Sequence, residues 1–509
     1  MLTVFCIGGY MVAEWRMKIE VQRFLERKIP NHIEFSYDAL NINLIYGDLA
    51  FDKVKVISLG RQTSSCEIRV QADLLSVEGF SYWKFFQKDA IYLKKLILSE
   101  PHLNFKTCPK DTTDNVTASK PINLLKPIFI KELIFNAGQV EIRDPDDEVE
   151  PLTVKTIQLS LNDVETNPEI INAYVPFKFS EYLVTVKELT TPLGAYERVK
   201  MGVLELDPQN IRVKDISLIT KHSKQALSGL IATERDHIDL RIPNIDVDHH
   251  SYAIEADTLH VFYEKLALTS AVLEIYRDKA VPENYDTRRL YSEMLRELPF
   301  KLKIDIVSIA EATIRYEEDA PNNVEAGVLN FENLNSTITN FSNLTSEKEN
   351  VQIRLNADLM GTGSLLLDWE FKVQNVNEAF VISGELSNFN TDKLNDFLVP
   401  NVRTKTTGTI DQLYFTISGD KYVASGDIKM RYQDFKLQVL NKDRINVNKI
   451  VSFIGNLFVS DGSKADANGF RYGEISVERP KNKSFFNYLW VGVEDGLIDV
   501  LTGNGKKED

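Results

Sequence analysis

The residues with the clearest potential for chemistry are the histidines and aspartates of Asp246-Val-Asp-His-His250, followed ten residues later by His260. Imidazole and carboxylate groups together can bind zinc. On a strand, Asp246, Asp248 and His250 would face one side and His249 the other. That separation favours a hydrated strand face or turn, so we expect no metal site. The alternative is a hydrolase that uses the His249 and His250 region.

Other sequence motifs give no catalytic signature. Gly361-Thr-Gly363 lacks the third glycine of a dinucleotide loop and leads into a strand pattern, so we expect a strand-end turn there. The sequence contains no Gly-x-Ser-x-Gly, His-Glu-x-x-His or Cys-x-x-Cys motif. The three cysteines are too few for a disulfide framework. Cys66 and Cys108 could form one disulfide, or both could be free thiols, and the sequence leaves both possibilities open. We therefore expect no enzyme activity, no catalytic residues and no cofactor.

Length and charge limit the classes of protein to consider. The chain has 509 residues, which exceeds the ~250–300 residues at which single cores stop growing. Its 43% hydrophobic and 26% charged residues are typical of a folded protein. The net charge of −15 argues against a nucleic-acid partner, because phosphate binding needs clustered Lys and Arg.

Alternation of apolar and polar residues dominates the chain. It is clearest in 351–359 and 365–373, and it recurs in 68–74, 302–306 and 413–417. Such alternation predicts strands of a sheet that has one apolar face and one solvent-exposed polar face. Antiparallel sheets tolerate this arrangement. Between 427 and 439 the apolar parity changes near Gln433–Asp434, and one extra residue there predicts a β-bulge.

The chain also repeats a short pattern of strand, small or Pro/Gly break, and second strand. The pattern occurs at 96–105, 133–142, 268–276 and 306–316. Units that cannot bury their own apolar face must stack on their neighbours. We therefore expect a repeating β architecture.

We divide the chain as follows. A truncated membrane anchor covers 1–15, an amphipathic helix 16–30, an N-terminal β region 31–106 and a linker 107–126. A repeating β body covers 127–483, with short helices at 286–298, 391–398 and 447–458. A C-terminal amphipathic helix, with Ser484 as its N-cap, covers 484–502, and 503–509 forms a disordered tail.

The first fifteen residues are largely apolar and end at Trp15, with basic residues following from Arg16. A spanning helix needs ~20 apolar residues, and a signal anchor begins with basic residues. We therefore expect that the natural start lies upstream and that this segment is the tail of an inner-membrane anchor. The alternative is a buried N-terminal helix.

Segments scattered over most of the chain resemble the AsmA family of bacterial envelope proteins, which includes the TamB-like proteins. They are Tyr46–Val56, Ala72–Gly79, Lys94–Pro101, Phe331–Ile338, Gly384–Asn390, Thr407–Phe415, Ala424–Asp427, Tyr432–Leu437 and Ser484–Trp490 with Gly496. The clearest reads Thr407-Gly-Thr-Ile-Asp-Gln-Leu-Tyr-Phe415. The likeness lies in the strand pattern, and this family has no catalytic residues to carry over.

The resemblance implies a mainly β fold: an elongated, twisted, antiparallel repeating sheet with an apolar groove and a few short helices. It implies an inner-membrane protein anchored by its N-terminus with a periplasmic body, linked to phospholipid transport or outer-membrane assembly. The expected partner is a phospholipid or other acyl lipid, held by inward-facing strand residues: Val351, Ile353, Leu355, Leu367, Trp369, Phe371, Leu413, Phe415, Ile428, Met430, Leu437 and Val439. The alternative is a non-enzymatic envelope scaffold that binds a protein partner through sheet edges.

Overall fold

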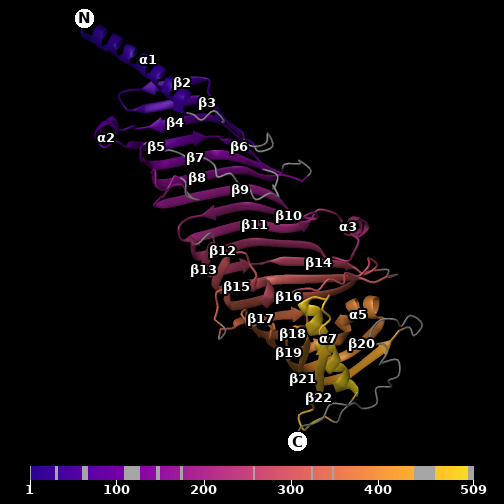
Figure 1. Cartoon of the computed structure of the whole chain (residues 1–509). Helices are drawn as coiled ribbons and strands as arrows, with labels where there is room; N and C mark the ends of the chain where they lie inside the picture. The colour runs from indigo at the N-terminus through magenta and orange to yellow at the C-terminus, as the bar shows by residue number, and fades with distance from the viewer. Residues whose placement is uncertain are drawn as a thin grey trace. The chain divides into compact units, whose positions relative to one another are not determined.

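The structure is a computed structural model that describes residues 2–28, 33–59, 67–107, 126–144, 149–171, 176–255, 258–321, 325–346, 349–440 and 465–502. Within these ranges the chain is mainly β, and its 22 strands are assigned to one mixed sheet (Figure 1). The chain divides into two compact units, Met1–Ile216 and Ser217–Asp509. Each unit has hydrophobic clusters of its own.

The first unit begins with one long helix and continues as neighbouring strands. Met17 and Val21 of the helix pack against a small core centred on Leu40 and Phe51. The elements are α1 (Leu2–Lys28), β1 (Ile33–Ser36), β2 (Ala39–Asn43), β3 (Asp48–Leu59), β4 (Glu67–Glu78), α2 (Tyr82–Gln87), β5 (Ile91–Ser99), β6 (His102–Lys106), β7 (Ile128–Arg143), β8 (Leu152–Thr166), β9 (Glu181–Leu193), β10 (Glu197–Leu206) and β11 (Asn210–Thr220), whose last residues belong to the second unit.

The second unit holds the largest hydrophobic core, formed by strands β17–β22 and the C-terminal helix. Its elements are α3 (Lys224–Leu230), β12 (His237–Glu255), β13 (Thr258–Thr269), β14 (Val272–Asp278), α4 (Tyr291–Arg296), β15 (Lys301–Asp319), β16 (Gly327–Ser342), β17 (Val351–Leu359), β18 (Gly363–Phe371), β19 (Phe380–Asn390), η1 (Thr391–Leu394), α5 (Asn395–Val402), β20 (Thr404–Gly419), β21 (Val423–Val439), β22 (Arg471–Glu478) and α7 (Phe485–Thr502).

The expectation of an antiparallel sheet is wrong in part, because the sheet is mixed. Most neighbours are antiparallel, but β5 and β6 both run parallel to β7, and β13 and β14 both run parallel to β15. In each case two consecutive strands act as one interrupted strand, since β5 and β6 both pair with β4, and β13 and β14 both pair with β12. The chain then crosses over before the next parallel strand, which alternation alone does not reveal.

The strands that pair in parallel are the same segments that carry the repeated sequence pattern. The break between β5 and β6 lies beside a bulge in β7, and left-handed residues mark both, with φ of +49° at Glu100 and +55° at Ala137. Ser270, at the break between β13 and β14, and Glu311 of β15 occupy the equivalent positions in the second repeat, with φ of +54° and +56°. The hydrogen bonds at the two breaks match as well. The amide nitrogen of Glu100 lies 2.8 Å from the carbonyl oxygen of Asn136, and that of Ser270 lies 2.8 Å from the carbonyl oxygen of Ala310. The repeat is therefore a structural unit.

The predicted β-bulge at Gln433–Asp434 is confirmed. The register of β20 and β21 shifts between Thr407 and Thr409, and Asp434 has a φ of +49°. Gly408 lies opposite, and a Cβ atom there would lie 2.5 Å from the Asp434 carbonyl oxygen, so the bulged backbone leaves no room for a side chain.

The predicted helices agree with the structure to different degrees. The C-terminal helix is confirmed, and the helix expected at 16–30 is part of α1. The helix expected at 286–298 is shorter, because the Arg288 amide donates to the Lys481 carbonyl at 2.8 Å and helical geometry begins only after Leu290. The turn expected at 391–398 continues to Val402.

Some predicted features lie outside the described residues. These are the helix at 447–458, all but the ends of the linker 107–126, the tail 503–509, and the cysteines Cys66 and Cys108. Within the part of the chain that is described, no helix is both long and apolar enough to cross a bilayer.

Candidate functional site

The predicted lipid-contacting residues of the second unit do lie on neighbouring strands. Leu355 is directly opposite Leu367 on β17 and β18, and Leu413 is opposite Met430 on β20 and β21. Those that are buried are Val351, Phe371, Leu413, Phe415, Ile428 and Met430, whereas Ile353, Leu355, Leu367, Trp369 and Leu437 are half-buried. The side chain of Val439 is outside the described set.

Helix α7 covers the buried part of this face. Gly492 and Gly496 lie on its inner side, and a Cβ atom at Gly496 would lie 2.5 Å from Cγ2 of Ile428. A Cβ atom at Gly473 of β22 would lie 2.4 Å from the Gly496 carbonyl oxygen. Helix and strand backbones are thus in close contact, as expected of a permanent cover rather than a loosely placed lid.

Aromatic rings close the end of the face where α7 begins. Phe485 stacks on Trp369 with 4.5 Å between ring centroids and 11° between planes, and it meets Phe380 edge-on at 5.0 Å. Tyr291 of α4 packs on Trp369 at 5.7 Å. Trp369 is therefore already engaged by the chain's own side chains.

Helix α7 also protects the edge of the sheet. Asp499 accepts a hydrogen bond from the backbone amide of Glu474 at 2.8 Å, and Asp495 accepts one from Ser476 at 2.9 Å. Unpaired amides on an edge strand invite pairing with another chain. Two carboxylates one helical turn apart therefore accept hydrogen bonds from two backbone amides of β22 that would otherwise be available for pairing with another strand.

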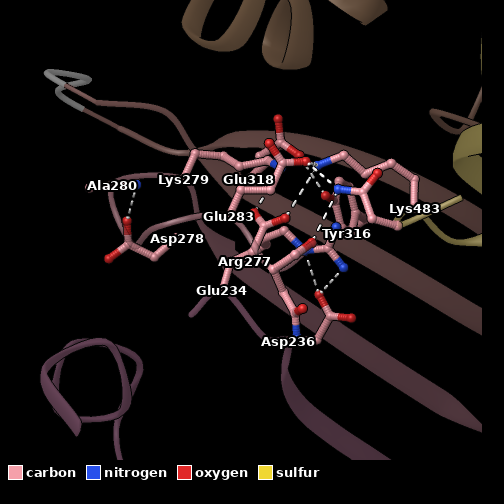
Figure 2. A network of polar contacts seen from close by, with 12 residues as sticks. Glu234, Asp236, Arg277, Asp278, Lys279, Ala280, Glu283, Tyr316, Glu318 and Lys483 are labelled. Atoms are coloured by element: carbon pink, nitrogen blue, oxygen red, sulfur yellow. Dashed lines mark hydrogen bonds and ion pairs between the residues drawn. The ribbon is translucent and has the colours of Figure 1, made fainter. Parts of the chain in front are cut away.

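A charged network fixes the segment that leads into α7 (Figure 2). Glu234, almost fully buried, accepts hydrogen bonds from Nζ of Lys279 at 3.0 Å and from Nζ of Lys483 at 3.3 Å. Lys483 is also paired with Glu283. Arg277 donates to Asp236 at 2.8 Å in the same cluster. Since Lys483 directly precedes Ser484, these contacts set where the helix starts.

The charges in this network stabilise one another. Burial by itself raises the pKa of Glu234, but the hydrogen bond from Lys279 and the charges of Lys279 and Lys483 outweigh it and hold the pKa below its ordinary value. The hydrogen bond from Lys483 lowers the pKa of Glu283. Both carboxylates are thus held ionised, which is typical of a structural ion-pair cluster.

A second buried carboxylate anchors α4. Glu378 accepts a hydrogen bond from the Ser292 hydroxyl at 2.5 Å and is paired with Arg296. Arg296 also donates to the Val373 carbonyl at 2.6 Å, and the hydrogen bond to Glu378 raises the pKa of its guanidinium. These bonds hold α4 beside the aromatic rings at the start of α7.

Beyond the aromatic rings, the middle of β15–β18 borders a shallow cleft of about 400 Å³. Its lining includes Ile309, Leu355 and Leu367 together with the exposed pair Arg354 and Asp368, whose side chains lie 3.1 Å apart. Two of the predicted lipid-contacting residues, Leu355 and Leu367, therefore border this cleft, and Leu367 also packs against the core of the unit.

The first unit carries a longer apolar surface that sequence reasoning missed. Seven residues form a row of directly opposite cross-strand pairs from β3 to β10, which we call the apolar ladder: Phe51, Leu75, Leu98, Phe135, Leu159, Val184 and Leu206. A second row on the same face consists of Leu49, Val77, Leu96, Leu133, Leu161 and Tyr182. Only Phe51 and Leu161 are fully buried.

Within the described residues, most of the ladder lacks the kind of cover that α7 gives the second unit. The main helix contacts of this unit are those of α1 with β2 and of α2 with β5, and α1 also packs on the small core that includes Phe51 at the start of the ladder. The ladder side chains on β7–β10 are half-buried, and in the second row Leu161 is buried. They touch their neighbours along the sheet but keep part of their surface open. The signal that could have located them was the repeat at 96–105 and 133–142, which places Leu98 beside Phe135.

The histidine segment does not form a site. His249 has a φ of +50° and is left out of the pairing between β12 and β13, although the register is the same on its two sides. His250 is buried whereas Asp246 and Asp248 are exposed, so the expected hydrated face does not include His250. His249 is exposed and lies 3.2 Å from Glu264. Across the described residues, no group of three or more His, Cys, Asp or Glu side chains could hold a metal ion.

Two comparisons with known proteins were informative only in finding no relative. A scan against protein-family models and a search of curated proteins both found no match. The resemblance to the AsmA family therefore remains a prediction from the sequence.

Proposed function

We propose that this chain is a non-enzymatic, AsmA-like envelope protein whose apolar sheet face holds the acyl chains of phospholipids. In this proposal it is anchored to the inner membrane by its N-terminus, its body lies in the periplasm, and it serves phospholipid transport or outer-membrane assembly. The observation that carries the proposal is the apolar ladder of the first unit. Its members align across seven strands and, apart from Phe51, are only half-buried.

The dimensions of the ladder fit this use. Seven strands at ~4.8 Å spacing give a row of about 29 Å. Half of a ~30 Å bilayer core, the depth that one acyl chain fills, is about 15 Å. Each Å² of apolar surface removed from water contributes ~25 cal/mol. A hydrocarbon chain laid along the row would therefore gain stabilisation that solvent cannot provide.

In this proposal the second unit itself contributes little lipid-binding surface. Six of the twelve predicted lipid-contacting residues are buried in the core that also contains side chains of α7, whose glycines are in close contact with β21 and β22. We propose that Ile353, Leu355 and Leu367, which remain half-buried, are the last residues in this unit that lipid could reach.

The lipid proposal can be tested with protein purified without detergent. Native mass spectrometry should detect bound phospholipid in the wild type. Leu159→Asp with Val184→Asp places two carboxylates in the ladder, where desolvation opposes them, and should remove the bound lipid. Ser160→Asp with Thr185→Asp puts the same charges on the same strands but on the opposite face, and should leave lipid in place.

The outcome distinguishes the two functions considered. A wild type that is monodisperse and free of lipid, or equal lipid loss in both double variants, would refute the groove. A scaffold would then be favoured, although the edge of β22 is poorly suited to bind a partner because Asp495 and Asp499 already occupy its amides.

A further inference from the structure

A group of large apolar side chains lies exposed near the N-terminal end of the first unit. Ile45 and Tyr46, in the turn between β2 and β3, are 75% and 70% exposed, and Trp83 of α2 is 69% exposed. Met11, Val12 and Trp15 of α1 are exposed as well. We call Trp15, Ile45, Tyr46 and Trp83 the N-terminal aromatic surface.

The local structure holds the turn in place. The Asn43 side-chain oxygen accepts hydrogen bonds from the amides of Ile45 and Tyr46 at 3.1 and 3.3 Å, which fixes the turn with both side chains exposed. Gly47 has a φ of +73°, and a Cβ atom there would lie 2.5 Å from the Phe80 carbonyl oxygen. Only glycine allows this approach, so the turn is held against the residues that precede α2.

Helices α1 and α2 belong to the same neighbourhood. The Phe80 amide donates to the Gly47 carbonyl at 2.9 Å, and the Phe80 ring packs edge-on against Tyr82 at 5.2 Å. Burial raises the pKa of Tyr82, with smaller contributions from Asp48 and from Tyr10 of α1, which places Tyr10 near this end. Met17 then packs α1 onto the core that also contacts Leu44 of the turn.

The charges around this surface are of both signs. Residues 43–47 have no charge and α2 contains lysine and no acid, whereas Asp48 follows the turn, Asp89 follows Lys88 and Glu14 precedes Trp15. Lys88 follows α2 and is exposed, and Arg16 follows Trp15. Exposed Trp and Tyr beside Lys and Arg are characteristic of membrane–water interfaces, where rings enter the headgroup layer and cations meet anionic lipid.

We propose that the N-terminal aromatic surface lies on a phospholipid bilayer, with Ile45, Tyr46 and Trp83 inserted into the headgroup region beside α1. The occupant is lipid rather than protein because the surface continues into α1, where residues 2–13 contain no charge and Met11 and Val12 are exposed. Three contact points from different segments would fix the tilt of the first unit on the membrane. This inference concerns attachment and does not depend on lipid in the groove.

Tryptophan fluorescence of the full chain can test the contact, using vesicles of phosphatidylcholine and phosphatidylglycerol at 3:1 with bromine on the acyl chains. The protein should float with the vesicles, and bromine should quench its emission. Trp83→Phe should remove part of that quenching. Trp490→Phe, on α7 of the second unit, should remove none. Flotation with quenching unaltered by Trp83→Phe, or no flotation at all, would overturn the proposal.

The turn offers a second measurement. Ile45→Ser with Tyr46→Ser should weaken partition onto the same vesicles by at least about tenfold, the loss expected when two apolar side chains no longer leave water. Tyr422→Ser with Val423→Ser is the matched control, because these neighbours sit at the β20–β21 turn and are each 53% exposed. Equal partition of the two variants would contradict the contact. Co-purified lipid, measured separately, reports on the groove alone.

Discussion

The close contact between α7 and β22 predicts a ranked response to added methyl groups. In Gly473→Ala, the new Cβ atom would lie 2.4 Å from the Gly496 carbonyl oxygen and 2.9 Å from the Val500 nitrogen. Both are backbone atoms, so rotation of a side chain cannot relieve the overlap. The helix must move away from the strand, and the contacts of α7 with the sheet weaken together.

The size of the effect follows from two opposing contributions. Overpacking a well-filled interior costs ~1–3 kcal/mol, and backbone overlap places Gly473→Ala near the upper limit. Loss of conformational freedom in the unfolded chain returns ~0.4–1 kcal/mol when glycine becomes alanine. We expect a net loss of about 2 kcal/mol in the free energy of unfolding, roughly a 30-fold change in the equilibrium constant.

Gly492→Ala, on the helix side of the same contact, is the matched control. Its Cβ atom would lie 3.1 Å from the terminal Cδ1 of Ile417, which can rotate, and at ordinary contact distance from Cγ2 of Ile475 and of Val477. Alanine is favoured over glycine inside a helix by ~1 kcal/mol, so this variant should be neutral or slightly more stable.

Urea unfolding followed by tryptophan fluorescence is a suitable assay, because Trp490 lies on α7 and Trp369 stacks on Phe485. Gly473→Ala should lower the midpoint of this transition, and Gly492→Ala should not. If Gly473→Ala were as stable as the wild type, or if Gly492→Ala were the more damaging, the close seating of α7 would be refuted.

Three further predictions concern other features. Glu234 has a lowered pKa in the folded state, so the stability that its ionised form contributes is complete above its unfolded pKa of 4.5 and is lost as the pH falls through the lower folded pKa. Glu234→Gln should therefore flatten the fall in the urea midpoint below about pH 5. If that fall were unchanged, pairing of Glu234 with Lys279 would be excluded as the cause of the acid destabilisation. Asp495→Ala with Asp499→Ala frees two backbone amides on β22, and the variant should self-associate as its concentration rises, which analytical ultracentrifugation would detect. A variant that stayed strictly monomeric would show that these two amides need no cover. Glu311 has a φ of +56°, so Glu311→Val should be about 1–2 kcal/mol less stable than Glu311→Gly in thermal unfolding, and equal stability would argue against the bulge.

Much of the β structure was predictable because it depends on local pattern. Alternation in 351–359 and 365–373 located β17 and β18, and the parity change near Asp434 located a bulge. The apolar pattern of 484–502 after Ser484 located the C-terminal helix. In each case the signal lies within a few residues of the structure that it predicts.

The candidate site was less predictable because it depends on pairing between distant segments. Leu98, Phe135 and Leu159 become neighbours only through the parallel crossover into β7 and the register of β8. Burial of Met430 under α7 likewise depends on where a helix some sixty residues later packs. The burial of His250 was not predicted either, and its neighbour His249 adopts a left-handed conformation that no spacing rule anticipates.

The matched breaks beside β7 and β15 have a consequence for how such a chain could change in length. The left-handed residues of each pair, Glu100 with Ala137 and Ser270 with Glu311, sit side by side at equivalent hydrogen-bonding positions. Gain or loss of a single residue beside one break would have to be absorbed by a further bulge, like the one at Asp434, whereas gain or loss of a whole crossover unit would leave the flanking strands in step. The crossover unit is therefore the increment by which evolution could lengthen or shorten this protein with the least disturbance to strand pairing.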